Sequence, residues 1–250
     1  MNKIKVGIVN YLNTAPLIYG LKNSSLIEQI ELIPDYPANL AKDLLNGTID
    51  LGLVPVAVIP QLSQWWLISD YCIGCEGPVA SVCIFSDVPI ENAERVLLDY
   101  QSGTSVELAK LLIKNYWKID PELIDAREDF QQHIHGKTAG LVIGDRSFTQ
   151  RKKSRYAYDL GEAWKAYTGL PFVFAAWVSN KPLDAAFIKS FNEANAFGIN
   201  NIPEVISSLN FNNSLDLEEY FKTYISYYLD EPKRNALRKF LQLLKKDFTV

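Results

Sequence analysis

The stretch IKVGIVNYLNTAPLIYGL, residues 4–21, decides the fold class of this chain. Its first six residues form an apolar run typical of a buried strand, and residues 15–21 have the spacing of a helix. Between them lies a junction, NYLNTAP, that is rich in short polar side chains and carries no charge. A strand that leads through such a junction into a helix is typical of an α/β protein.

The same alternation continues along the chain. A strand is predicted at residues 27–36, and a helix begins at residue 38 and is ended by Gly47. Residues 50–59 are predicted as a short strand that breaks into a proline-flanked turn or helix. A second series has strands at 95–98, 119–126 and 138–145, with a helix at 106–116. Helices are predicted over the C-terminal residues at 183–199, 202–209, 217–228 and 231–246. The pattern predicts two α/β units, each with a mainly parallel sheet, followed by helices.

Two long apolar strands, residues 79–85 and 171–178, lie where the chain passes between these units. Two lobes joined by two crossings form a hinge with a cleft that suits a small ligand. We therefore predict lobe 1 from residues 1–86 and 177–250, and lobe 2 from residues 87–176. The aromatic segment at 217–229 is expected to pack onto lobe 1, while a monomer and a homodimer both remain open.

Composition excludes several classes of partner. The 250 residues carry a net charge of −4, with lysine and arginine spread along the chain, which argues against nucleic acid. No apolar run reaches the length of about 18 residues that a membrane span needs, so no membrane partner is predicted. The N-terminus lacks the features of a secretory signal, and a cytoplasmic location is expected.

The cysteines and histidines do not indicate a metal or redox site. Cys72, Cys75 and Cys83 are an odd number of thiols, and the second ligand pair of a usual zinc site is missing. We expect Cys72 and Cys75 to be small, semi-buried side chains in a glycine-rich loop. His133 and His135 are expected at the surface. No metal and no cofactor is predicted.

Two polar junctions are the first candidates for a ligand site, because ligands of α/β proteins bind beyond the carboxyl ends of strands. In NYLNTAP, Thr14 is predicted to cap the helix, which leaves Asn13 without a structural role. In DYQSGTS, residues 99–105, Gly103 allows close approach of a ligand, and Thr104 and Ser105 offer hydroxyls. Ser105 also suits a helix cap. Two uncharged helix N-termini, one in each unit, suit a ligand with two carboxylates.

Two further candidates lie elsewhere. Gly144 and Asp145 follow the strand at 138–143, and Asp145 either caps the next element or accepts a hydrogen bond from a ligand. Ser81 lies on a predicted crossing strand, where it either faces the cleft or bonds a backbone carbonyl. No Ser-His-Asp order, phosphate loop or carboxylate pair stands out.

With these elements in place, the chain resembles the chorismate dehydratase family of the futalosine route to menaquinone. The resemblance covers nearly the whole chain, and its most specific segment is YDLGEAWKAYTGLPFVFAAWV, residues 158–178. Its other carriers are GIVNYLNTAPL, LLNGTIDLGLVPV, ISDYCIGCEGPVASVCIFS, LDYQSGTSVELAKLL and AGLVIGD. The resemblance implies a fold like a type 2 periplasmic binding protein, with two lobes around a cleft and two crossing strands.

The resemblance also implies an activity, the dehydration of chorismate to 3-[(1-carboxyvinyl)oxy]benzoate, without a cofactor. Asn13 is then the catalytic candidate. By likeness, the substrate-contacting positions are Asn13, Ser81, Thr104, Ser105, Gly144 and Asp145. The chain departs from the family pattern at Arg146, where a small apolar residue is expected, and at Ala80.

Two alternatives stay open. The sister family, 1,4-dihydroxy-6-naphthoate synthase, shares the fold but carries a histidine where this chain has Ile143-Gly144-Asp145. The other is a cytoplasmic, non-catalytic binding protein for a small dicarboxylate.

Overall fold

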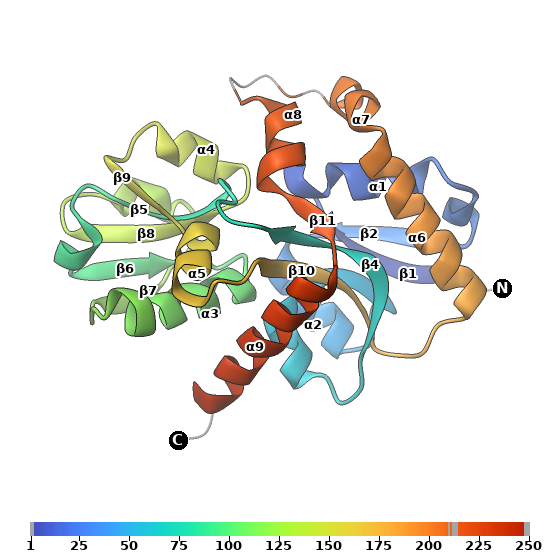
Figure 1. Cartoon of the computed structure of the whole chain (residues 1–250), viewed down its shortest axis with the longest axis horizontal. Coiled ribbons are helices and arrows are strands. Elements are labelled where there is room, and N and C mark those ends of the chain that lie inside the picture. The colour runs from blue at the N-terminus through green and yellow to red at the C-terminus, as the bar shows by residue number, and fades with distance from the viewer. Residues whose placement is uncertain (1–2, 210, 212–214, 248–250) are drawn as a thin grey trace.

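The computed structural model describes residues 3–209, 211 and 215–247, and it contains two sheets that lie side by side (Figure 1). We use lobe 1 for the six-stranded sheet with its helices and lobe 2 for the five-stranded sheet with its helices. The two-lobed α/β architecture predicted from the sequence is confirmed.

The sheet of lobe 1 has the strand order β11-β4-β10-β3-β1-β2. Its strands are β1 (Ile4–Val9), β2 (Ile30–Asp35), β3 (Leu51–Pro55), β4 (Trp66–Cys75), β10 (Phe172–Ser179) and β11 (Ser226–Tyr228). Strands β1, β2 and β3 are parallel, whereas β10 runs antiparallel to both β3 and β4. The prediction of a mainly parallel sheet was therefore wrong here, because the chain returns from lobe 2 as a reversed strand between β3 and β4.

The sheet of lobe 2 repeats this mixed design, in the order β7-β6-β8-β5-β9. Its strands are β5 (Val82–Ser86), β6 (Arg95–Leu98), β7 (Glu122–Asp125), β8 (Thr138–Ile143) and β9 (Tyr156–Asp159). Strands β6, β7 and β8 are parallel, and β5 is antiparallel to its neighbours β8 and β9.

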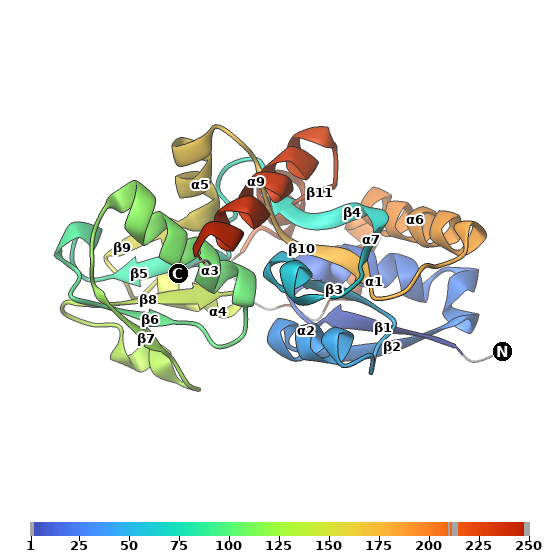
Figure 2. The ribbon, with the colours of Figure 1, turned by 90° about the horizontal axis from the view of Figure 1, so that it is seen from below.

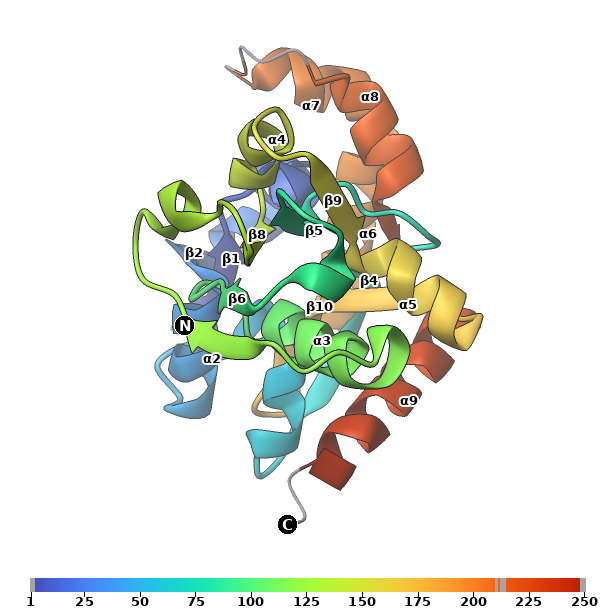
Figure 3. The same ribbon diagram turned by 90° about the vertical axis from the view of Figure 1, so that its left-hand side faces the viewer.

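The helices cover both sheets. In lobe 1 they are α1 (Ala15–Lys22), α2 (Pro37–Leu45), α6 (Ala185–Asn200), α7 (Ile202–Ser208), α8 (Leu217–Glu219) and α9 (Glu231–Asp247). In lobe 2 they are α3 (Gly103–Leu112), α4 (Arg146–Arg151) and α5 (Leu160–Thr168). Figure 3 shows lobe 2 from its end, with α3 on one side of the sheet and α4 on the other. Helix α9 lies against β10 near the junction of the lobes (Figure 2).

Helix α1, which follows the NYLNTAP junction, is fixed by a close approach to α6. A Cβ atom at Gly20 would lie 1.9 Å from the carbonyl oxygen of Ala194, and one at Gly198 would lie 1.8 Å from that of Pro16. Only glycine allows the two backbones to come this close. The start of α1 is therefore held in one position relative to the sheet.

The C-terminal aromatic segment differs from the prediction. The helix expected over 217–228 is only α8 and one π-helical turn, Tyr220–Tyr224, before the chain becomes strand β11. Tyr227 is buried and Tyr228 is 51% exposed, the alternation of a strand with one face toward the core. Tyr220 is buried at the junction of the lobes, against Phe148 of α4, rather than on lobe 1 alone.

The chain crosses between the sheets immediately before β5 and immediately before β10, through residues 76–81 and 169–171. Asp159 holds the first crossing, because its carboxylate accepts hydrogen bonds from the N–H groups of Val79 and Ala80. Ala80 adopts φ +64°, a strained conformation for a residue with a side chain. The lobe boundaries stay a prediction. Because β4 and β10 belong to one sheet and β5 and β9 to the other, we propose that the boundaries lie in these two crossings.

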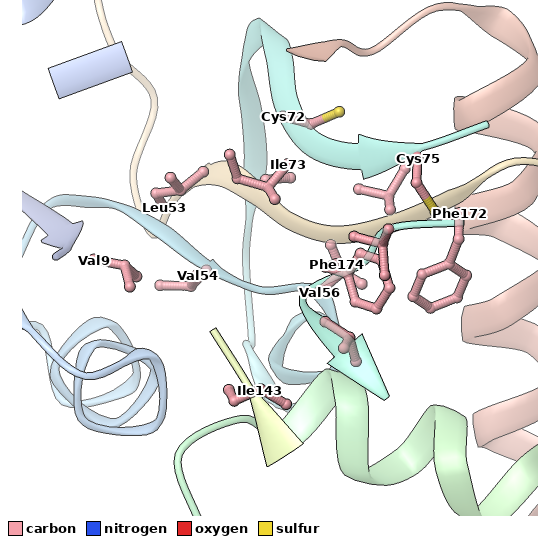
Figure 4. Close-up of a cluster of buried hydrophobic side chains, with 14 of the residues drawn as sticks. Val9, Leu53, Val54, Val56, Cys72, Ile73, Cys75, Ile143, Phe172 and Phe174 are labelled. Carbon is pink, nitrogen blue, oxygen red and sulfur yellow. The ribbon is translucent and has the colours of Figure 1, made fainter. Parts of the chain in front are cut away.

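The cysteines belong to the core rather than to a loop. Cys72 and Cys75 lie within β4, so the prediction of a glycine-rich loop was wrong, because the strand continues through both residues (Figure 4). All three thiols are free and buried, and burial raises the pKa of Cys72 to about 12. Burial also raises the pKa of the Cys75 and Cys83 thiols, which disfavours the reactive thiolate form at neutral pH.

Candidate ligand site between the lobes

A small pocket, open on one side, lies between the two sheets. Its floor is apolar and includes Leu53, Ile73, Ile143 and Phe174, which Figure 4 shows converging from four strands. Its polar side chains are those of Tyr11, Asn13, Thr14, Ser102 and Ser105. None of the described residues that line it is charged. Such a pocket suits an organic ligand held by a few directed hydrogen bonds.

Asn13 is the polar group in this pocket that the fold leaves unused. Its Oδ1 atom is buried and has no hydrogen-bond partner among the described residues. Its backbone carbonyl accepts a hydrogen bond of 2.9 Å from the Tyr227 hydroxyl, which fixes the turn before α1. A buried amide oxygen without a partner is costly, and a ligand hydroxyl would satisfy it.

Thr14 lines the pocket but does not cap α1 as predicted. It occupies the N-cap position with helical φ and ψ, because a 3₁₀ turn at Leu12–Thr14 leads directly into the helix. Its hydroxyl instead lies within hydrogen-bond distance of the carbonyl oxygens of Val9 and Tyr11. The side chain therefore fastens the end of β1 to the turn that carries Asn13.

The N-terminus of α3 forms the opposite wall. Ser102, and not Ser105 as predicted, is the N-cap, because the helix already begins at Gly103. The Ser102 hydroxyl oxygen accepts a hydrogen bond from the Ser105 N–H, and the two hydroxyls are 3.1 Å apart. The first N–H groups of a helix lack partners within the helix and favour anions. This wall can receive a carboxylate without a cationic side chain.

Gly144 brings lobe 2 into contact with the NYLNTAP segment of lobe 1, which connects β1 to α1. Its φ of +63° belongs to the left-handed region, and a Cβ at this position would lie 3.2 Å from the Tyr11 ring. Glycine is required here both by the backbone and by the neighbouring ring. Gly144 and Tyr11 together close one side of the pocket.

Four of the predicted site residues lie outside the pocket lining. Thr104 is fully buried and its hydroxyl accepts a hydrogen bond from the Ala57 N–H, 3.1 Å. Gly103 is exposed on the other side of the helix start.

Ser81 and Asp145 complete this group. The Ser81 hydroxyl donates to the backbone carbonyl of Val79 at 3.4 Å, as one of the two predicted alternatives stated, and it also accepts a 2.8 Å hydrogen bond from the Tyr220 hydroxyl. Asp145 accepts a hydrogen bond from the Leu12 N–H, and burial raises the pKa of its carboxyl group. Substrate contact by these four residues stays a prediction that their placement does not favour.

Sequence reasoning missed a hydrogen-bonded group of four residues beside the pocket, of which Arg146 had stood out only as a departure from the family pattern. Arg146 forms an ion pair with the buried Asp99, with 2.7 Å between Nη2 and Oδ2. The same nitrogen is 2.7 Å from Oε1 of Gln101, which also accepts a hydrogen bond from the Tyr11 hydroxyl. Tyr11 and Gln101 are 90 residues apart, so no local pattern could have paired them.

His133 and His135 are exposed, as predicted. Within the described part of the chain, no group of three or more histidine, cysteine or acidic side chains is placed to hold a metal ion. None of the described helices is long and apolar enough to cross a membrane.

Solved structures define the class of protein. A protein of Archaeoglobus fulgidus aligns with a TM-score of 0.78 and 18% identity, covering 99% of this chain and 98% of its own. The aliphatic sulphonate binding protein SsuA of Escherichia coli aligns with a TM-score of 0.58 and 15% identity, covering 100% of this chain and 89% of its own. These likenesses identify the periplasmic-binding-protein fold, here with its pocket between the lobes.

Sequence relatives narrow the class to a family. Residues 4–246 match a family described as menaquinone biosynthesis, and the chain belongs to that family. It is 28% identical to the chorismate dehydratase of Thermus thermophilus, over 98% of this chain and 96% of the relative. It is 27% identical to the chorismate dehydratase of Campylobacter jejuni, over 96% of each.

Proposed function

We propose that this protein is a lyase that dehydrates chorismate to 3-[(1-carboxyvinyl)oxy]benzoate in the futalosine route to menaquinone, and that it acts in the cytoplasm. Membership of the menaquinone biosynthesis family and the two chorismate dehydratase relatives support the reaction. The observation that carries the proposal is the unpartnered Asn13 oxygen in an uncharged pocket.

The chemistry of chorismate suits this pocket. The substrate has two carboxylates and a ring that becomes aromatic when water is lost. The reaction removes the proton from C3 and the hydroxyl group from C4, and the electrons of the C3–H bond complete the aromatic ring. Because aromatisation drives the step, the site has to align the substrate more than supply a strong base.

The proposed roles follow from the geometry. The N-terminus of α3 receives one carboxylate, and the apolar floor excludes water from the ring. Asn13 orients either the leaving hydroxyl or the enolpyruvyl side chain, whose own carboxylate takes the C3 proton. The proposal therefore assigns no protein base.

The test is incubation of the purified protein with chorismate, followed by ultraviolet absorbance and mass spectrometry. We expect an aromatic product that is lighter than chorismate by one water. Asn13→Ala should lower kcat by about 100-fold, the scale of losing one directed hydrogen-bonding group at a reacting centre. Its melting temperature should stay near that of the wild type, because Oδ1 has no hydrogen-bond partner in the part of the chain that the structure describes. Full turnover by this variant would remove Asn13 from the mechanism.

The fold alone favours a second candidate, a non-catalytic binding protein for a small dicarboxylate, since its structural neighbours include ligand-binding components. Tight binding of chorismate without any product would support it. A 1,4-dihydroxy-6-naphthoate synthase activity has less support, because Gly144 and Asp145 stand where that family carries a histidine.

A further inference from the structure

A chain of hydrogen bonds joins the two lobes beside the pocket. It starts at Asp99 in lobe 2, passes through Arg146 to the side-chain amide of Gln101, and ends at the hydroxyl of Tyr11 in lobe 1. Asp99 is fully buried, Gln101 is 4% exposed and the Arg146 side chain is 29% exposed. We call these four residues the interlobe brace.

The arrangement fixes the direction of each hydrogen bond. Arg146 can only donate, so Oε1 of Gln101 must face it, and the amide nitrogen then donates to the Tyr100 hydroxyl at 2.9 Å. The Tyr11 hydroxyl is also hydrogen-bonded to Oε1 of Gln101, and it has to be the donor because this oxygen can only accept. The ring of Tyr11 is thus held at one end by Gln101 and on one face by Gly144.

The charges of the brace are balanced within it. Asp99 accepts hydrogen bonds from the N–H groups of Gln101 and Ile143 as well as from Arg146. A buried carboxylate is tolerated only with such partners. Arg146 thus allows Asp99 to be buried, and it presents Gln101 to the other lobe.

The backbones of the two lobes also meet at this place. The N–H of Ala38 donates to the carbonyl oxygen of Gln101, and the N–H of Leu12 donates to Asp145. The brace therefore lies at an interlobe contact and reaches the pocket through Tyr11 alone.

We propose that Arg146 and Gln101 are positioning residues that hold Tyr11 as a wall of the pocket and keep the lobes closed in the ligand-free protein. The inference rests on the proposed function for the identity of the ligand, but not for the closed state. A preformed closed pocket raises apparent affinity, because the ligand need not supply the free energy of closure. Asp99, Gln101 and Arg146 do not line the pocket, so we expect them to act on binding rather than on chemistry.

The kinetic test compares three variants on chorismate. Tyr11→Phe, Gln101→Met and Arg146→Ala should each raise KM by about tenfold and change kcat by less than about twofold. Arg146→Lys should recover part of the affinity, since lysine also donates. Tyr11→Phe combined with Gln101→Met should be no worse than Gln101→Met alone, because Gln101→Met already removes the hydrogen bond to Tyr11.

The matched control is Arg234→Ala in α9. Arg234 is 30% exposed and pairs at 3.1 Å with Asp70, so it matches Arg146 in its own exposure, but its partner is exposed rather than buried and it lies outside the brace. KM should not change in this variant. Equal effects of Arg146→Ala and Arg234→Ala, or additive effects of Tyr11→Phe and Gln101→Met, would overturn the proposal.

A ligand-free measurement separates this inference from the proposed function. Small-angle X-ray scattering should give a larger radius of gyration for Tyr11→Phe and Arg146→Ala than for the wild type and Arg234→Ala. Tyr11→Phe keeps the ion pair between Arg146 and Asp99 intact, so this variant tests the proposal even if Arg146→Ala misfolds. If the wild type does not convert chorismate but the two brace variants expand, the proposed function fails and the closed state stands. If all four proteins have the same radius of gyration, the brace does not hold the lobes closed.

Discussion

At the scale of single residues, Gly144 places the greatest constraint on the pocket. Gly144→Ala should destabilise the protein by about 1 kcal/mol, because alanine is strained at a positive φ. It should also weaken ligand binding. The new methyl group would lie 3.2 Å from the Tyr11 ring, which is too close, so the ring has to move. Urea denaturation measures the first effect, and the apparent Kd or KM measures the second.

Gly136 offers a control with the same backbone strain. Its φ is +58°, and a Cβ there meets nothing within 4 Å. Gly136→Ala should therefore lose similar stability and keep wild-type affinity. Equal affinities of the two variants would show that the contact between Gly144 and Tyr11 does not shape the site.

The residue scale also shows what the sequence reveals and what it conceals. Asn13 could be singled out because Thr14 was expected to cap α1; Thr14 makes no such cap, but the Asn13 oxygen has no hydrogen-bond partner among the described residues. Thr104 and Ser81 are also short polar residues at predicted site positions, but their hydroxyl oxygens accept hydrogen bonds from the Ala57 N–H and the Tyr220 hydroxyl. Those partners are 47 and 139 residues away, beyond the reach of local patterns.

At the scale of elements, Asp159 links a helix cap to an interlobe crossing. Its carboxylate accepts hydrogen bonds from the N–H groups of Gly161 and Glu162 at the start of α5, and from those of Val79 and Ala80 in the crossing. Asp159→Ala should lower the free energy of unfolding by about 4 kcal/mol, because it leaves several buried N–H groups unpaired. Chemical denaturation measures the loss.

Asp184 is the matched comparison, because it caps α6 through the N–H groups of Ala186 and Phe187 and is exposed. Asp184→Ala should cost about 1 kcal/mol, the usual value of a helix cap. A similar loss in both variants would mean that the contacts of Asp159 with the crossing contribute nothing.

Most elements could be predicted from the sequence, because apolar periodicity marks β1, β6, β8 and the long helices. The strand direction of β10 could not, because parallel and antiparallel partners share the same apolar pattern. Strand β11 was missed for a related reason. Its three residues continue a helical aromatic pattern, and only pairing with β4, which places them at the edge of the sheet, makes them a strand.

At the scale of the whole molecule, one hydrophobic cluster runs through both lobes. It includes Val6 and Leu53 of lobe 1 together with Ile84 and Leu108 of lobe 2. Smaller interlobe contacts add to it, among them the hydrogen bond between Thr104 and Ala57. A shared core of this kind opposes independent unfolding of the lobes, because separating them exposes apolar surface of both.

We therefore expect a single cooperative unfolding transition. Trp177 reports on lobe 1 and Trp117 on lobe 2, so variants in which one of these two is the only one of the five tryptophans left follow each lobe by fluorescence. Both curves should coincide with that from circular dichroism. A saturating ligand at about 100 times its Kd should shift both by about 2.7 kcal/mol, because it binds only the folded pair of lobes. Two separated transitions, or a ligand shift confined to one tryptophan, would show that the lobes fold independently and that the pocket is not held by their common core.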